Sequence, residues 1–390
     1  MIGTNRPNVL VTGASGLIGS RLVRALSPDH RIIAMDLQEP REALPESACF
    51  LPVDLTSEEG TERAVREATA ICGDEVASAI HLAAHYDFTG APSPLYRDLT
   101  IEGTRRLLRA LRRSTHTSQL VFVSTLLAME PADEGTLLTE RSPVQGEWAY
   151  PRSKLAAEGV IREERGEISS VVVRLAGVYD DWGHSPPLSQ QIWRIRERKL
   201  ESVLFPGDRS HGQSFIHLDD AVRGLHAIVE RRGDLPSEET FLIGEPETMA
   251  YHELQARIGE AIHGRQWPTI RIPRFVARAG AWMKENTPLL SDEGFIQPWM
   301  IDLADARYPI SIEHAKAQLD WEPWHRLSDK LPEILSNLEK DPVRWYREND
   351  LPRPREAIST LTKSAPTGTE RIGDPTAPRA ERPEPPSNEL

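Results

Sequence analysis

The stretch YPRSK places a phenol, Tyr150, and an ammonium group, Lys154, four residues apart. On a helix this spacing puts both side chains on one face, where the ammonium group favours the ionised phenol. Pro151 suits a first helical turn, which sets Tyr150 near the positive end of the helix dipole. The pair therefore suits proton transfer to or from a hydroxyl group, although alone it also fits an ordinary exposed helix start.

A hydroxyl partner for this pair stands at the end of the apolar run QLVFVST. Thr125 ends that run, and the adjacent Ser124 competes for the same role. A hydroxyl group here would orient a substrate oxygen while Tyr150 exchanges its proton. General acid–base catalysis of this kind contributes about 10²–10⁴-fold to a rate.

A glycine-rich stretch, VTGASGLIG, follows the first apolar run and precedes a helical pattern. Gly13, Gly16 and Gly19 allow a tight turn, close approach of pyrophosphate and packing of helix on strand. The helix start offers unpaired N–H groups to phosphate. Asp36 ends the next strand, where a carboxylate binds the ribose 2′-OH and repels a 2′-phosphate. The pattern predicts a dinucleotide and favours NAD over NADP, a preference that the nearby Arg41 softens.

The elements around these residues alternate between short apolar strands and amphipathic helices. Such alternation, with nearly continuous apolar strands, predicts an α/β fold: a Rossmann-type doubly wound parallel sheet covered on both faces. The expected strands are 8–13, 31–36, 49–54, 78–84, 119–125, 169–177 and 240–244.

Three parts of the chain are expected. Residues 1–177 and 212–245 form the NAD-binding domain. Residues 178–211 and 246–345, richer in proline and tryptophan, form a smaller mixed substrate-binding domain. Residues 352–390 are proline-rich and polar, which predicts a disordered tail.

Composition excludes several functions. The net charge of −13 argues against a nucleic-acid partner, which needs a basic face. No apolar run of about 18 residues occurs, so no membrane insertion is expected. Two distant cysteines, Cys49 and Cys72, are expected to be buried thiols in a reducing, cytoplasmic protein, and no metal site is predicted.

The order of these motifs resembles the extended short-chain dehydrogenase/reductase family, and within it the NAD-dependent epimerase/dehydratase group. Besides TGASGLIG and YPRSK, the resemblance includes PVDL, HLAA, SFIHLDD and LDWEPWHRLSDKL, and it covers roughly residues 8–340. It implies catalytic roles for Thr125, Tyr150 and Lys154. It also implies a set of cofactor-binding residues: Gly13, Ser15, Gly16, Leu17, Ile18, Gly19, Asp36, Asp54, Leu55, Leu82, Ala83, Ala84, Tyr150 and Lys154.

Four positions depart from the family pattern. Thr100 replaces an asparagine that supports the lysine through water, and Met129 replaces a tyrosine, which predicts a more apolar pocket wall. Gly177 and Gln213 replace the asparagine and arginine that sugar-nucleotide enzymes use. An amide cannot reproduce the charged, bidentate grip of arginine on phosphate. Arg209 is the remaining candidate for a phosphate clamp.

These departures leave the substrate open between classes. The expected substrate is a small molecule with a secondary alcohol or ketone, contacted by Tyr86, Gly177 and Gln213. Loops carrying His85, Asp181 and His184 are expected to face it. The alternatives are a sugar-nucleotide 4-epimerase or dehydratase, a hydroxysteroid-type dehydrogenase, and a non-catalytic NAD-sensing module. The resemblance also implies a homodimer.

Overall fold

The computed structural model describes residues 6–87, 90–279, 301, 303–352 and 354. Of the expected tail at 352–390, all but Pro352 and Pro354 lie outside these described residues. None of the described helices is both long enough and apolar enough to cross a membrane.

A seven-stranded parallel sheet forms the centre of the fold, in the order β10-β6-β5-β4-β1-β2-β3. Its interior strands are apolar on both faces because helices cover both, so the α/β prediction is confirmed. The order reverses between β1 and β4, where a parallel sheet opens a crevice at its carboxyl edge. The strands are β1 (Asn8–Thr12), β2 (Arg31–Asp36), β3 (Ala48–Pro52), β4 (Glu75–His81), β5 (His116–Thr125), β6 (Ser169–Leu175) and β10 (Glu238–Ile243).

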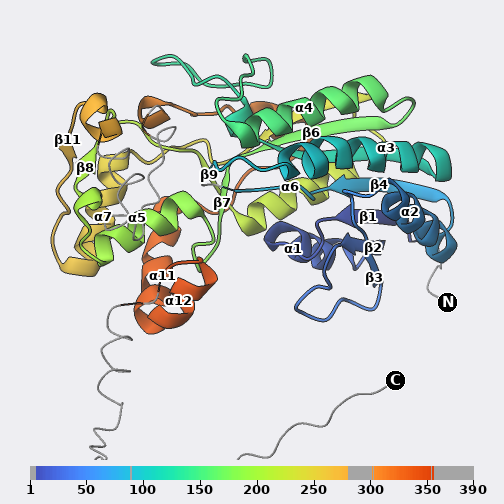
Figure 1. Ribbon diagram of the computed structural model, residues 1–390, viewed down its shortest axis with the longest axis horizontal. Helices are drawn as coiled ribbons and strands as arrows, with labels where there is room; N and C mark the ends of the chain where they lie inside the picture. The colour runs from blue at the N-terminus through green and yellow to red at the C-terminus, as the bar shows by residue number, and fades with distance from the viewer. Residues whose placement is uncertain (1–5, 88–89, 280–300, 302, 353, 355–390) are drawn as a thin grey trace, which may run out of the picture. The chain divides into compact units, whose positions relative to one another are not determined.

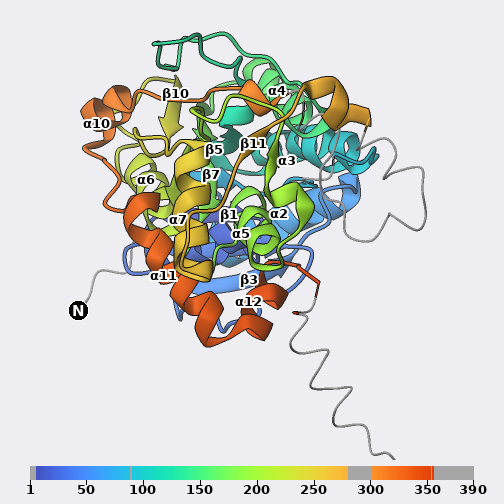
Figure 2. The same ribbon diagram turned by 90° about the vertical axis from the view of Figure 1, so that its left-hand side faces the viewer.

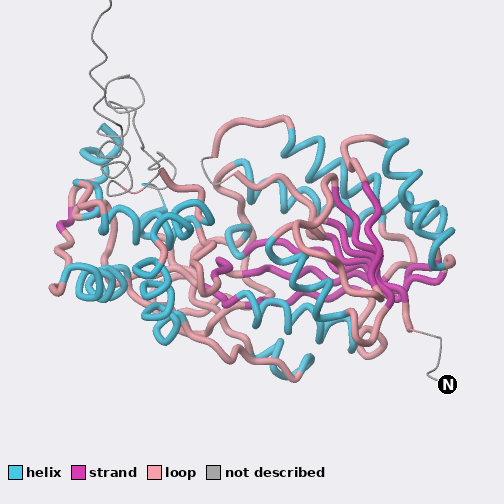
Figure 3. The backbone as a smooth tube through the Cα atoms, turned by 90° about the horizontal axis from the view of Figure 1, so that it is seen from below, coloured by secondary structure: helices cyan, strands magenta, loops and turns pink. Residues whose placement is uncertain are grey.

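Two helical layers enclose the sheet, and Figure 3 shows helices on both sides of the strands. One apolar core packs α1 and α6 against one face, and a second packs α2, α3 and α4 against the other (Figure 1). The layers are built from α1 (Leu17–Leu26), α2 (Glu58–Cys72), α3 (Glu102–Ser114), α4 (Ala149–Glu164), α6 (Leu218–Glu230) and α10 (Glu313–Leu319).

A further group of helices has its own apolar core, and Figure 2 shows α5, α7, α11 and α12 together. Trp193, Trp267 and Trp345 are buried in that core, as expected of tryptophans that pack. Its elements are α5 (Pro186–Arg196), α7 (Tyr251–His263), α11 (Leu327–Lys340), α12 (Pro342–Glu348), and the short parallel pairs β7 (Gly177–Tyr179) with β9 (Phe215–His217) and β8 (Leu204–Phe205) with β11 (Ile270–Arg271). The boundaries of a separate substrate domain stay a prediction.

The chain before α3 forms a π-helix, Tyr96–Ile101. Such wide turns are rare and occur frequently at functional sites. Short 3-10 turns complete the structure at Leu126–Ala128, Leu200–Ser202 and Leu303–Asp305.

Candidate active site

Tyr150 and Lys154 lie one turn apart at the start of α4, which begins at Ala149. The ring of Tyr150 meets Tyr86 edge-on, with ring centroids 5.0 Å apart. Trp148 is the residue before the helix, and the centroids of its ring and the Tyr150 ring are 5.6 Å apart. The helix start and the aromatic neighbours together fix the direction of the phenol.

Electrostatics at Tyr150 reflect its half-buried position. Desolvation raises the pKa of the phenol above its ordinary value, while a side-chain hydrogen bond with Thr125 lowers it. In the free protein the phenol therefore carries its proton at neutral pH. Proton abstraction by Tyr150 needs further positive charge nearby, and Lys154 follows it by one turn on the same helix.

Lys154 is buried and donates a hydrogen bond from Nζ to the Val123 carbonyl oxygen at 2.8 Å. Its ammonium group also lies 4.8 Å from the centre of the Phe122 ring. Burial lowers the pKa of Lys154 to about 7, and the charge of Glu158 opposes that shift. Near neutral pH the lysine is therefore balanced between its charged and neutral forms.

Two adjacent hydroxyl groups end β5, and they make different contacts. Ser124 donates to Glu158 Oε1 at 2.5 Å within a buried network. Thr125 accepts a hydrogen bond from the Leu127 backbone N–H at 3.2 Å and interacts with Tyr150. Thr125, and not Ser124, is thus the hydroxyl group beside the phenol.

The glycine-rich turn brings backbone segments into close contact, as expected from its three glycines. Gly13 has a positive φ of 72°, and a Cβ there would lie 2.7 Å from the Ala83 backbone nitrogen. A Cβ on Gly19 would lie 2.1 Å from the Gly13 carbonyl oxygen. Gly16 caps α1 without a side-chain hydrogen bond, so the first N–H groups of the helix, at Leu17 and Ile18, have no acceptor within it. This is a cradle that fits pyrophosphate.

Asp36 joins this turn to the end of β2. Its Oδ2 accepts from the Ser15 backbone N–H at 2.9 Å, and its Oδ1 accepts from Leu37 at 2.7 Å. The Ser15 hydroxyl group donates to the Gln38 carbonyl oxygen at 2.6 Å. The carboxylate expected to bind ribose is therefore held in place by the same loop that forms the cradle.

The remaining expected cofactor residues follow β3 and β4 at the same edge of the sheet. Asp54 is exposed and accepts from the Thr56 hydroxyl and N–H groups at 2.6 and 2.9 Å, while Leu55 is buried. Leu82 donates its N–H to the Thr12 carbonyl oxygen at 3.1 Å. Ala83 and Ala84 come directly after it and are half-buried.

A buried network of hydrogen bonds near the carboxyl edge of the sheet was not predicted from the sequence. His81 bridges the Thr12 and Thr104 hydroxyl groups at 2.7 and 2.9 Å. Burial, assisted by the charge of Lys154, lowers the pKa of His81 to about 3, so the ring stays neutral. Thr100 is fully buried in the π-helix and accepts from the His85 N–H at 3.0 Å. The histidine of HLAA, His81, was the one residue in the sequence that could have indicated this network.

The expected substrate residues are distributed unevenly. Tyr86 contacts Tyr150 and is 50% exposed. Gly177 lies in β7 beside Phe215, whose ring a Cβ would approach to 3.3 Å, so glycine makes room for that ring. Gln213 is exposed, two residues before β9. Arg209 donates to the Thr269 carbonyl oxygen at 2.8 Å, which weakens its case as a phosphate clamp.

Three side chains expected near the substrate have partners within the protein, and their expected positions in the pocket wall stay predictions. Met129 is fully buried in the apolar core. His184 pairs with Asp180 at 2.7 Å, and Asp181 pairs with Lys330 at 2.6 Å.

The cysteines are only half-buried, so the expectation of buried thiols holds in part. Burial nonetheless raises the pKa of both Cys49 and Cys72. Among the described residues, Asp74, Glu75 and His116 bring possible metal-ligand atoms within 4.8 Å of one another. All three are exposed, as acidic surface groups without a metal commonly are.

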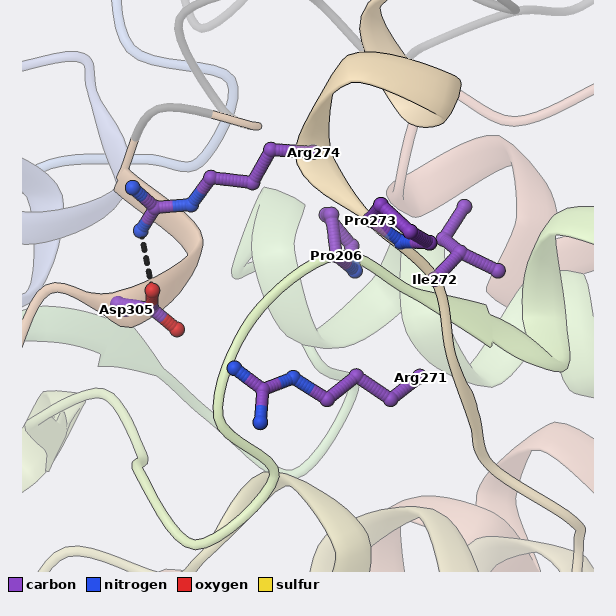
Figure 4. A pocket seen from close by; sticks show the side chains of 6 residues that line it. All are labelled: Pro206, Arg271, Ile272, Pro273, Arg274 and Asp305. Carbon is purple, nitrogen blue, oxygen red and sulfur yellow. Dashed lines mark hydrogen bonds and ion pairs between the residues drawn. The ribbon is translucent and has the colours of Figure 1, made fainter.

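A cavity of about 420 Å³ lies beside β8 and β11 (Figure 4). Its lining residues are Pro206, Arg271, Ile272, Pro273, Arg274 and Asp305. Arg274 is paired with Asp305, whereas no ion pair of Arg271 is seen within the described part of the chain. The cavity therefore presents a guanidinium group to whatever enters it.

Fold and cradle together define a dinucleotide-binding enzyme of the Rossmann type. The sequence profile of the NAD dependent epimerase/dehydratase family matches residues 9–244. The chain belongs to this family, whose cofactor is NAD, and the closed turn and Asp36 fit that cofactor.

Curated relatives agree with this assignment. Human short-chain dehydrogenase/reductase family 42E member 1 is 23% identical over 82% of this chain and 84% of its own length. The dTDP-glucose 4,6-dehydratase of Streptomyces griseus is 28% identical over 81% of this chain and 96% of its own length. The chain is similar to both at nearly full domain length.

Solved structures show the same fold. The UDP-glucose 4-epimerase of Thermotoga maritima, solved with UDP-glucose, has a TM-score of 0.62 at 21% identity, over 86% of this chain and 99% of its own. The dTDP-glucose 4,6-dehydratase of Streptomyces venezuelae, solved with NAD and TYD, has a TM-score of 0.63 at 22% identity, over 88% and 97%.

Proposed function

We propose that this enzyme transfers hydride between NAD and a secondary alcohol or its ketone, with Tyr150 as the acid/base. The observation that carries the proposal is the joint position of Tyr150, Lys154 and Thr125 at the carboxyl edge of a sheet that also forms a pyrophosphate cradle. An idle nucleotide-binding module would have no need of all three.

The roles of the three side chains follow from their surroundings. Bound NAD supplies the hydride acceptor and, when oxidised, a positive ring. Thr125 orients the substrate oxygen, and Tyr150 takes the proton from that oxygen as the carbonyl forms. Desolvation raises the pKa of the phenol and the hydrogen bond with Thr125 lowers it. A charged Lys154 one turn away would favour the ionised phenol further. In the reverse direction Tyr150 returns the proton to the alkoxide oxygen.

The cofactor preference rests on the loop around Asp36. A carboxylate held by Ser15 and Leu37 cannot move aside for a 2′-phosphate without losing two hydrogen bonds. We therefore propose NAD over NADP. Gly13, Gly16 and Gly19 would hold the pyrophosphate, Asp54 and Leu55 the adenine, and the segment 82–84 the nicotinamide half.

The test is Tyr150→Phe, with Tyr308→Phe as a control at another buried tyrosine. Turnover of a panel of secondary alcohols and ketones is followed as NADH absorbance, and NAD binding is followed by calorimetry. We expect Tyr150→Phe to bind NAD normally and to lose turnover by at least about 10²-fold, the usual contribution of a general acid–base. Undiminished turnover would contradict the assignment.

A second candidate is a sugar-nucleotide 4-epimerase or dehydratase. It is favoured by the arginine-lined cavity beside β8 and β11 and by the similarity to a dTDP-glucose 4,6-dehydratase. Gly177 and Gln213 weigh against it, since neither provides the usual polar grip on a diphosphate. Thermal-shift measurements with UDP and dTDP decide: a rise in melting temperature that Arg271→Met abolishes would support this candidate, and no rise would favour a substrate without a nucleotide.

We also propose how the chain assembles and where in the cell it is found. The resemblance implies a homodimer, which light scattering of the purified chain tests, and a cytoplasmic location is expected. Within the chain, α3 and α4 already pack together, with Glu164 paired to Arg105 and Arg109. A dimer formed through these two helices would therefore use their outer surfaces.

A further inference from the structure

Three consecutive residues of β5 are each in contact with a different residue on one face of α4. Val123 accepts a hydrogen bond from Lys154 at 2.8 Å, and Ser124 donates one to Glu158 at 2.5 Å. Thr125, the third, interacts with Tyr150. Tyr150, Lys154 and Glu158 follow one another at four-residue intervals, which keeps them on one face of the helix.

Glu158 is also tied to a third element. Arg174 on β6 binds it in two places, at 2.8 Å to Oε2 and at 3.4 Å to Oε1. Ser124 and Arg174 are register partners in the β5–β6 ladder, so the carboxylate spans the two strands just before β5 ends. Both charged side chains are buried, and salt does little to screen them.

We propose that Glu158 is a positioning residue, which favours the protonated form of Lys154 and holds α4 in register with the end of β5. This proposal deepens the proposed function and rests on it. Glu158 contacts none of the reacting groups directly; it acts through Lys154 and Ser124. Its charge attracts the ammonium group one turn away, and its hydrogen bonds fix the strand that carries Thr125.

Among the described residues, the other groups around Lys154 offer no negative charge, so its protonation depends on Glu158. His81 faces it from β4 and is neutral at pH 7, because burial lowers the pKa of the ring to about 3. Phe122 and the Val123 carbonyl oxygen face it from β5 and carry no net charge. Tyr150 on α4 is protonated in the free protein. Arg174 on β6 is paired with Glu158, and Glu158 is the charged group that opposes the effect of burial on Lys154.

The test titrates Lys154 directly in the full-length protein, without any substrate. Lysine is labelled with ¹³C, and the Lys154 resonance is assigned by its absence from Lys154→Met. In Glu158→Gln we expect its titration midpoint to fall by about one pH unit or more, the usual effect of a nearby opposite charge. In Arg174→Gln, which frees the carboxylate charge, we expect the midpoint to rise. Glu163→Gln, at an exposed carboxylate on the same helix, should leave it unchanged.

Opposite shifts in the two variants support the proposal. Unchanged midpoints, or shifts in the same direction, would overturn it, because a merely structural role does not follow the sign of the removed charge. If one variant does not fold, the direction of shift in the other still decides. A negative result here leaves the Tyr150→Phe experiment untouched, so the two proposals fail separately.

Discussion

Gly19 on α1 lies so close to Gly13 that a Cβ on Gly19 would sit 2.1 Å from the Gly13 carbonyl oxygen. The atoms nearest to that Cβ are backbone atoms of Gly13 and Ala14, and backbone cannot move aside as a flexible side chain can. The first turn of α1 therefore lies directly against the end of β1, and this close packing aims its N–H groups at the cradle.

Gly19→Ala should consequently lose NAD binding and part of its stability. The added methyl group must push α1 from the strand, and we expect the free energy of unfolding to fall by about 1–3 kcal/mol, the usual range for overpacked sites. Gly159→Ala is the matched control: its Cβ meets nothing within 4 Å, in the middle of α4. That variant should be stabilised by up to about 1 kcal/mol. Urea denaturation and calorimetry with NAD measure both; equal behaviour would contradict the prediction.

Asp36→Asn should change cofactor preference. The amide removes the charge that repels a 2′-phosphate, and its nitrogen cannot accept one of the two backbone hydrogen bonds. We expect the ratio of NADP to NAD dissociation constants to fall at least about tenfold, equivalent to about 1.4 kcal/mol. Asp29→Asn, at an exposed aspartate before β2, should leave the ratio unchanged. A constant ratio in Asp36→Asn would show that selectivity lies elsewhere.

Removing either of the two hydroxyl groups at the end of β5 should have a different effect: one removal lowers turnover, and the other lowers stability. Thr125→Val should lower turnover about 10²-fold or more while NAD binding changes little. Ser124→Ala should instead lower the free energy of unfolding by about 1–3 kcal/mol, because it leaves a buried carboxylate with one donor fewer. Its turnover should fall less than that of Thr125→Val. The reverse order of turnover would assign the catalytic hydroxyl group to Ser124.

Glu245 predicts a pH dependence of stability. It is buried, accepts from the Tyr179 hydroxyl group and the Leu327 N–H at 2.9 Å each, and burial raises its pKa to about 7 from 4.5. An acid whose pKa is raised by folding stabilises the protein fully below pH 4.5, and this contribution is lost as the pH rises through about 7.

The free energy of unfolding of the wild type, minus that of Glu245→Gln, should therefore fall by about 3 kcal/mol between pH 4.5 and pH 8. Urea denaturation across this range measures it. Glu247→Gln, at an exposed carboxylate two residues away, should show no such trend. A flat difference for Glu245→Gln would mean that this carboxyl group ionises normally in the folded state.

The sequence predicted the parts of the site that depend on local pattern. Apolar runs predicted the strands, and YPRSK predicted a helix start because proline and four-residue spacing act within one turn. The glycine triplet and Asp36 belong to the same strand–turn–helix–strand unit, so their proximity also followed.

The contacts that the sequence did not predict join residues across strands. Ser124, Glu158 and Arg174 meet only once the register of β5 against β6 is set, and no single stretch contains that register. Gly177 looked like a lost substrate contact, yet Phe215 from β9 occupies the space beside it. Met129 stands near the catalytic strand in sequence but points into the core.

The two hydrogen bonds to Asp36 have a kinetic consequence. An ionised carboxylate offers about four lone-pair positions, and here two are taken by the backbone, which leaves about two for the hydroxyl groups of a ribose. Because these two hydrogen bonds hold the carboxylate in place, we expect little conformational entropy to be lost on association. We expect NAD to bind in one rapid step, with differences in affinity among variants of this loop expressed in the dissociation rate.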